Sequence, residues 1–283
     1  MTTITEETVD PYEGFDPVER LGRAAKKAAG SLTRESARTL VDMYYRWQEH
    51  RIALNGQLRA QLQGYDGDDA DESLQVIEYF AQQTTKLERT AASVLGEWAA
   101  QRPEGEWAQS QLGIGPVLSA GLSAHIDITK APTVGHIWRF AGLDPTVKWE
   151  KKQRRPWNAD LKVLCWKIGD SFVKVSGRED AYYGQVYRKR KELEVGRDLA
   201  GLFADQAAKT LEEKKIRDPE TLKIYENGHL PAGRLDLRAR RYAVKLFLSH
   251  WHEVAYTAEY GTRPPFPYPI EHLGHAHVIP VPR

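Results

Sequence analysis

Cysteine is almost absent from this chain, because Cys165 is the only one among 283 residues. A lone thiol excludes an intramolecular disulfide framework. Cys165 falls within an apolar helical pattern. We therefore expect a small buried side chain there and not a catalytic nucleophile.

Long apolar runs are also missing. No segment approaches the roughly 20 apolar residues that a membrane-spanning helix needs. Residues 1–16 are acidic and contain neither the basic region nor the apolar region of a signal peptide. These absences predict a cytoplasmic protein with no membrane partner.

Sequence motifs of catalysis are absent as well. The chain contains no recognisable nucleophilic triad, no Walker loop and no dinucleotide-binding glycine fingerprint. We therefore predict no catalytic residue and no cofactor. Carboxylates from distant segments can still converge in a fold, so the sequence leaves an enzyme open.

Histidines gather in the last third of the chain and raise the question of a metal site. Five of them are His250, His252, His272, His275 and His277. A structural zinc site usually has thiolates or closely spaced imidazoles in a closed shell, and the tail has no cysteine. We expect these histidines to be packed or solvated and to bind no metal.

Charge is balanced overall but unevenly distributed. The chain has 40 Lys and Arg against 39 Asp and Glu. Residues 1–19 contain 6 acidic residues and no Lys or Arg, whereas residues 145–197 contain 14 basic and 7 acidic residues. Such asymmetry is typical of a nucleic-acid-binding protein. The alternative is a basic helical surface that is merely solvated.

Helical periodicity is abundant and strand signals are scarce, so the sequence predicts a mainly α fold. After a candidate N-cap at Thr33, apolar residues recur at heptad spacing over 40–58, with Arg51 as a polar exception. A second helical pattern covers 74–98 after an acidic link at 65–69. We expect a long antiparallel hairpin, coiled-coil-like in its spacing. It would pack on the rest of the chain or on a second copy in a homodimer.

Four segments follow from these patterns. They are an acidic tail with a short helix at 1–32, the helical hairpin at 33–102, a helix-hairpin-helix domain at 103–196, and a helical extension with a Pro- and His-rich tail at 197–283.

The segment 112–126 bears most directly on function. Gly113 and Gly115 can adopt backbone angles that a side chain would forbid, which would leave amide N–H groups directed outward. Pro116 suits the first turn of the apolar helix that follows. Outward amides beside a helix N-terminus suit a phosphate group, as in a helix-hairpin-helix that contacts the DNA backbone. The DNA-binding candidates here are Gly113, Ile114, Gly115 and Val117. The alternative is an ordinary glycine-containing turn.

Two groups of cations are further candidates for phosphate contacts. One lies in the loop 146–157 and the start of the helix capped by Asn158, and the other forms a stripe on the last long helix. The candidates are Lys148, Lys151, Lys152, Arg154, Arg155, Lys162, Arg238 and Arg241, with Arg234 and Lys245 in the same stripe. Solvated basic faces are the alternative, as they are for the run at 188–191. We expect Trp149 and Trp157 to anchor the loop to the core.

The order of motifs over residues 110–176 resembles the C-terminal half of insertion-sequence 110/116/902 family transposases. A Gly-Ile-Gly turn opens the segment 113–126, a short helix ends in Ala-Gly-Leu-Asp-Pro at 141–145, and a basic loop precedes the helix start at 158–162. The resemblance implies a protein that takes part in DNA rearrangement and binds double-stranded DNA through a helix-hairpin-helix.

The chain departs from that family in two respects. The family has an N-terminal RuvC-like domain whose strands carry metal-binding acids, whereas residues 1–110 here have a helical pattern. The family also uses a serine in the loop after Leu-Asp-Pro, and no serine occurs between Pro145 and Asn158. The sequence therefore predicts a transposase-related DNA-binding protein without catalytic activity of its own. The alternatives are an active subunit completed in trans and a helical scaffold or assembly protein.

Overall fold

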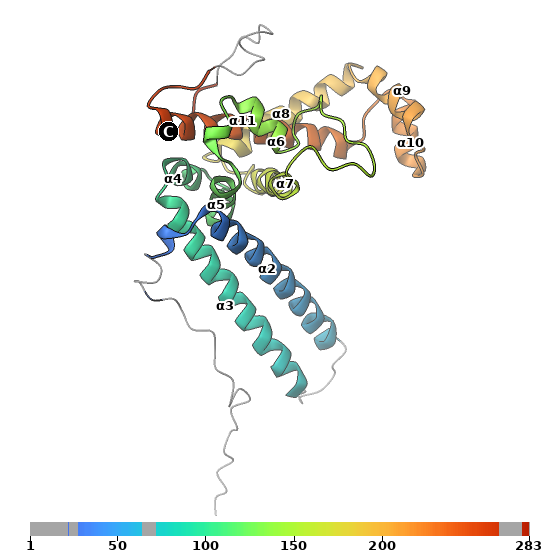
Figure 1. Ribbon diagram of the computed structural model, residues 1–283. Helices are drawn as coiled ribbons and strands as arrows, with labels where there is room; N and C mark the ends of the chain where they lie inside the picture. The colour runs from blue at the N-terminus through green and yellow to red at the C-terminus, as the bar shows by residue number, and fades with distance from the viewer. Residues whose placement is uncertain (1–21, 23–27, 64–71, 266–278, 283) are drawn as a thin grey trace, which may run out of the picture. The chain divides into compact units, whose positions relative to one another are not determined.

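The computed structural model describes residue 22 and residues 28–63, 72–265 and 279–282 (Figure 1). The acidic tail up to Glu19, the link at 65–69 and the histidines at 272, 275 and 277 lie outside the described residues. The described part of the chain is mainly α-helical and contains no strand, which confirms the predicted fold class. The elements are η1 (Ala29–Ser31), α2 (Arg34–Gln63), α3 (Glu72–Ala100), α4 (Pro103–Ser110), α5 (Pro116–His125), η2 (Ile128–Lys130), α6 (Val134–Phe140), α7 (Ala159–Lys174), α8 (Tyr182–Leu199), α9 (Ala204–Glu213), α10 (Pro219–Glu226) and α11 (Ala232–Tyr260).

The chain divides into two compact units, Met1–Gln101 and Arg102–Arg283. The predicted segments 103–196 and 197–283 therefore belong to one unit, because α11 packs on α4, α6, α7 and α8. None of the described helices combines the length and the apolar character that a membrane crossing requires.

In the first unit, α2 and α3 pack against each other in opposite directions. Thr33 Oγ1 accepts a hydrogen bond from the Ser36 amide (3.1 Å), so the expected N-cap begins α2. Near that end the Trp98 indole donates to the Leu32 carbonyl (2.7 Å). Farther along the pair, Arg51 forms an ion pair with Glu88. The polar exception in the heptad pattern thus has a charged partner on the other helix.

In the second unit, an aromatic cluster joins α11 to three other helices. Phe247 stacks on Trp107 of α4, with ring centroids 5.5 Å apart. It also meets the edges of Phe172 on α7 and Tyr183 on α8. Aromatic pairs of this kind combine apolar burial with favourable ring geometry. The cluster fixes α11 at the centre of the unit.

A smaller apolar cluster packs α9 and α10 against the start of α11. Its buried members are Phe203, Ala207, Tyr225, Leu230 and Leu235. Asp198 holds the segment that leads from α10 into α11, because its carboxylate accepts a hydrogen bond from the Leu230 amide (2.9 Å). This cluster places α9 beside the basic stripe on α11.

The single thiol is buried as the sequence predicts. Cys165 is 2 % exposed on the inner face of α7. Burial raises the pKa of this thiol to about 12, so the thiolate that would act as a nucleophile is not populated near neutral pH.

Candidate nucleic-acid interface

Glycine is required at the first position of the Gly-Ile-Gly turn between α4 and α5. Gly113 has φ 96°, a conformation that residues with a side chain rarely adopt. Its carbonyl accepts a hydrogen bond from Ser171 Oγ on α7. A β-carbon at this position would lie 3.2 Å from Val175 Cγ2. Gly113 therefore serves the packing of the turn onto the C-terminal end of α7.

The second glycine has an ordinary backbone. Gly115 has φ −85° and ψ 176°, the extended conformation that a following proline favours. A β-carbon here would meet nothing within 4 Å. The expectation that both glycines need special backbone angles is thus wrong for Gly115.

At the four predicted contact residues of this turn, only the backbone is available to a ligand. Ile114 and Val117 are 4 % and 7 % exposed, so their side chains belong to the core. Within the described part of the chain, the amides of Gly115, Val117 and Leu118 donate no hydrogen bond, as is usual for the first turn of a helix. These amides form the remaining candidate contact for a phosphate.

The basic loop after α6 is held by a few polar contacts. The Asn158 amide donates to the Phe140 carbonyl (2.8 Å), which closes the loop at its base. Asn158 Oδ1 then accepts from the Leu161 amide (2.8 Å) and begins α7 as the predicted N-cap. At the tip, the Trp149 indole donates to the Gln153 carbonyl (2.8 Å). Lys152 lies between these two residues with φ 75°.

The loop cations project into solvent. Lys148, Lys151, Lys152, Arg154 and Arg155 are all exposed, and none of them forms an ion pair with a described residue. A group of uncompensated like charges creates a positive potential that attracts polyanions.

The two tryptophans of the loop behave differently. Trp149 is 42 % exposed, so the expectation of a core anchor is wrong for this residue. The Arg155 guanidinium lies over its ring, 5.7 Å from the centroid. Trp157 is half-buried against Gly142 and carries Lys162 Nζ 4.0 Å above its ring centroid. Trp157 thus fixes the loop to the start of α7.

The loop, α7 and α11 bring cations close together around Lys162. Partial burial lowers the pKa of Lys162, and the positive charges of Arg155 and Arg241 lower it further. The residues Lys148, Lys151, Lys152, Arg154, Arg155, Lys162 and Arg241 are called the basic surface below.

The predicted stripe on α11 divides into cations with different partners. Arg238 Nε donates to the buried carboxylate of Glu194 (2.7 Å), so its charge is compensated within the fold. Lys245 lies over the Trp138 ring, 4.1 Å from the centroid. Arg241 donates to the carbonyl of Leu237 on its own helix, and no described carboxylate pairs with it. Arg238 and Arg241 are the two predicted DNA contacts on this stripe, and only Arg241 has no ion-pair partner among the described residues.

The run at 188–191 is largely neutralised. Arg188 pairs with Glu192 (3.5 Å), Lys191 with Asp236 (3.1 Å), and Arg190 with Glu194. This run therefore offers less free positive charge than the loop.

The Gly-Ile-Gly turn and the basic loop lie at opposite ends of α7. The turn contacts Ser171 and Val175, whereas the loop leads into Asn158 and Lys162. The nine residues from Lys162 to Ser171 correspond to about 14 Å of helix. The predicted site residues thus form two separate candidate contacts.

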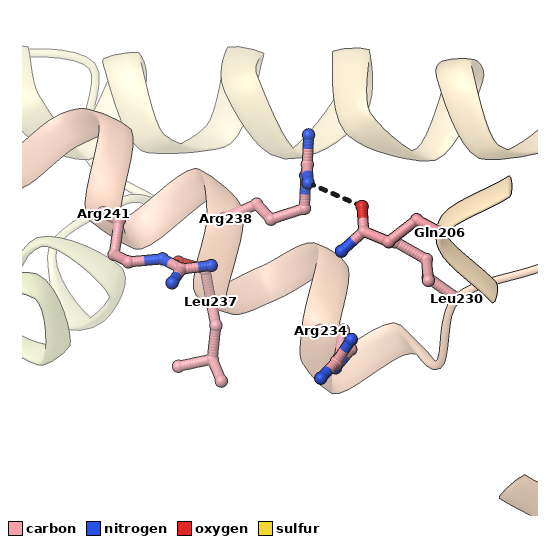
Figure 2. Close-up of a pocket in the computed structure, with 6 residues that line it drawn as sticks. All are labelled: Gln206, Leu230, Arg234, Leu237, Arg238 and Arg241. Carbon is pink, nitrogen blue, oxygen red and sulfur yellow. Dashed lines mark hydrogen bonds between the residues drawn. The ribbon is translucent and has the colours of Figure 1, made fainter. Parts of the chain in front are cut away.

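A pocket on α11 was not evident from the sequence. It has a volume of about 270 Å³ and is lined by Gln206, Leu230, Arg234, Leu237, Arg238 and Arg241 (Figure 2). The spacing of the stripe indicates that the three arginines share a face. No sequence signal places Gln206 of α9 opposite them.

No group of His, Cys, Asp and Glu that could hold a metal occurs among the described residues. His250 and His252 have other roles, because His250 lies between Tyr183 and the Ile279 carbonyl and His252 contacts the Ala131 carbonyl. The arrangement of the unit instead favours electrostatic attraction of an anion.

No protein-family model, no curated protein and no solved structure matches this chain.

Proposed function

We propose that this chain is a transposase-related DNA-binding protein that contacts the duplex backbone and has no catalytic activity of its own. The observation that carries the proposal is the basic surface, whose seven cations have no described carboxylate partner. The resemblance of the motifs over 110–176 to insertion-sequence 110/116/902 family transposases supports it. The amides at the start of α5 that donate no hydrogen bond to a described residue offer a second, weaker contact to the DNA backbone.

Salt dependence is the physical signature of this mode of binding. Each phosphate that a cation neutralises releases condensed counterions, so the logarithm of the affinity falls with the logarithm of the salt concentration by about 0.9 for each contact. Seven contacts would give a slope of about −6. Binding of this kind is only weakly dependent on sequence, because phosphates carry no direct base information.

The test replaces three loop cations at once, as Lys151→Ala, Lys152→Ala and Arg154→Ala. We expect the slope to become less steep by about 2.7, because three contacts are lost. Fluorescence anisotropy of a labelled random duplex over a salt series measures it. A matched control is Lys214→Ala, Lys215→Ala and Arg217→Ala, which removes the same charge from three exposed residues between α9 and α10.

The control should bind DNA with the parent slope. Equal slopes for the parent and the loop variant would contradict the assignment of the loop to DNA. Absence of DNA binding by the parent at low salt would overturn the proposed function as a whole.

A second candidate is a role in assembly through the first unit, and the poor burial of α2 favours it. Over its 30 residues, only Ala37 and Val41 of α2 are buried. Ile52 and Leu62 of α2 are 58 % and 59 % exposed, and Phe80 of α3 is 51 % exposed. Large apolar side chains that stay in water on paired helices are typical of a surface that binds a partner. A homodimer through α2 and α3 would cover them.

A further inference from the structure

The pocket on α11 concentrates arginine side chains from a single helix face. Arg234, Arg238 and Arg241 lie along successive turns, and Figure 2 shows all three bordering the same open space. Gln206 of α9 stands opposite them, and Leu237 adds an apolar wall. Arginine is the side chain best suited to bind phosphate, because its planar guanidinium donates several hydrogen bonds in a fixed geometry.

The positive charge of this pocket exceeds its negative charge. Glu194 is the carboxylate beside it, and Glu194 already pairs with Arg190 as well as with Arg238. Among the described residues Arg234 forms no ion pair. It donates to the neutral hydroxyl of Thr210 (3.4 Å) and lies over the Tyr225 ring, 5.9 Å from the centroid. Burial lowers the pKa of Arg241, and the charges of Arg238 and Arg234 lower it further, so the three side chains repel one another. A bound anion would relieve this repulsion.

Part of the pocket is held in place before any ligand binds. Arg238 is fixed by Glu194, by Gln206 Oε1 (3.2 Å) and by the Phe203 ring, 4.4 Å from its guanidinium. Because Gln206 Oε1 accepts from Arg238, the NH₂ group of the same amide remains as a further donor. Preorganised donors bind an anion with a smaller loss of entropy.

The size and walls of the pocket indicate a phosphate attached to an organic group. A volume of about 270 Å³ is many times the roughly 10–15 Å³ that a single water molecule needs. Leu230 and Leu237 would face the uncharged part of such a ligand. Arg241 also belongs to the basic surface, so the pocket continues the path of the DNA contacts proposed above.

We propose that this pocket binds a phosphate monoester and, resting on the proposed function, that this is the terminal phosphate of a DNA strand. A monoester carries up to two negative charges, whereas each internal backbone phosphate carries one. Several guanidinium groups around one pocket match the larger charge. A free small phosphate compound has the same chemistry, and the experiment separates the two sources.

The experiment uses the full chain and its Arg234→Gln, Arg241→Gln double variant. Both replaced side chains lack a described carboxylate partner, so the variant leaves the ion pairs of Glu194 intact. Arg217→Gln is the control, because Arg217 is exposed and does not line the pocket. The probes are inorganic phosphate, by calorimetry and thermal shift, and two duplexes that differ only in a 5′-phosphate or a 5′-hydroxyl.

We expect the parent and the control to bind the 5′-phosphate duplex about tenfold more tightly than the 5′-hydroxyl duplex. The double variant should bind both duplexes equally and show no thermal shift with inorganic phosphate. If inorganic phosphate shifts the unfolding temperature of the parent but not of the double variant, while the parent binds both duplexes equally, the pocket is assigned to free phosphate compounds. That result would overturn the proposal that it binds the end of a DNA strand. No response of the parent to either probe would overturn the pocket altogether.

Failure of the proposed function gives a different result. The loop variant described above would leave the response to inorganic phosphate unchanged, because its three cations lie outside the pocket. If the parent binds inorganic phosphate but no duplex, the phosphate site is supported and its assignment to DNA is overturned.

Discussion

At the scale of single residues, the two glycines of the turn have different physical roles. Gly113 is needed by the fold itself, since its φ is positive and its carbonyl is bound by Ser171. Gly115 has an ordinary conformation and open space around it. A side chain at Gly115 would therefore interfere only with a molecule that approaches the turn from outside.

This difference predicts different outcomes for two alanine variants. Gly113→Ala should lower the free energy of unfolding by about 1–3 kcal/mol, because a residue with a side chain is strained at positive φ. Gly115→Ala should change it by less than about 1 kcal/mol, because the smaller conformational freedom of the unfolded chain is offset by the poorer N-cap that alanine makes for α5. Urea denaturation followed by circular dichroism measures both.

The same two alanine variants also test whether the amides at the start of α5 contact DNA. If DNA approaches this backbone closely, Gly115→Ala weakens duplex binding without a large loss of stability. Duplex affinity equal to that of the parent would assign the turn to packing alone.

At the scale of elements, α11 is joined to α8 and to the C-terminal segment by a buried histidine. His250 Nε2 donates to the Ile279 carbonyl (2.9 Å), which leaves Nδ1 to accept from the Tyr183 hydroxyl (2.7 Å). His252 donates to the Ala131 carbonyl after η2 (2.8 Å). Burial favours the neutral form of both imidazoles and lowers the pKa of each, although these hydrogen bonds to carbonyls act in the opposite direction.

These histidines predict a loss of stability in weak acid. Burial lowers the pKa of both from 6.5, and His136 adds to the effect at His252. The unfolded chain takes up protons near pH 6.5 and the folded chain only at lower pH, so the stabilisation is complete above pH 6.5 and declines as the pH falls. Thermal unfolding between pH 7.5 and 5 measures the decline. In the His250→Gln, His252→Gln variant the dependence should be weaker, and an equally steep dependence would rule out these residues as its source.

The starts of the helices were predictable because local chemistry sets them. Thr33 and Asn158 cap α2 and α7 through their own side chains, and Pro116 occupies the first turn of α5. These signals depend on neighbours a few residues apart, which the sequence displays directly.

The candidate site was less predictable because distant partners decide which cations are free. Arg238 and Arg241 look equivalent on the helix, yet Arg238 meets Glu194, a residue 44 positions away. The sequence suggests that Trp149 anchors the loop to the core, yet its indole donates a hydrogen bond to the Gln153 carbonyl within the same loop. Only the tertiary packing distinguishes a compensated charge from a free one.

At the scale of the whole molecule, the two units carry different kinds of surface. The first presents exposed apolar side chains on α2 and α3. The second presents the basic surface, together with exposed apolar side chains of its own such as Trp166 and Leu199. The functions proposed above would divide assembly and nucleic-acid binding between the two units.

The apolar side chains of the first unit predict a dimer that charge would disrupt. Ile52→Glu with Phe80→Glu should convert a dimeric parent into monomers, because burying carboxylates against an apolar partner is costly. Sedimentation velocity gives the mass of each species. Leu199→Glu, at a 76 % exposed apolar residue of α8, is the matched control and should stay dimeric. A parent that sediments as a monomer would contradict the assembly role.

The burial of Cys165 also makes the chain a convenient object for spectroscopy. Since it is the only cysteine and its thiol is buried, thiol-reactive reagents have no target on the native surface. A cysteine introduced at Lys151 would therefore be a unique attachment point for a spin label or a fluorophore. Distances from that label to a labelled duplex would report the position of the loop on bound DNA directly.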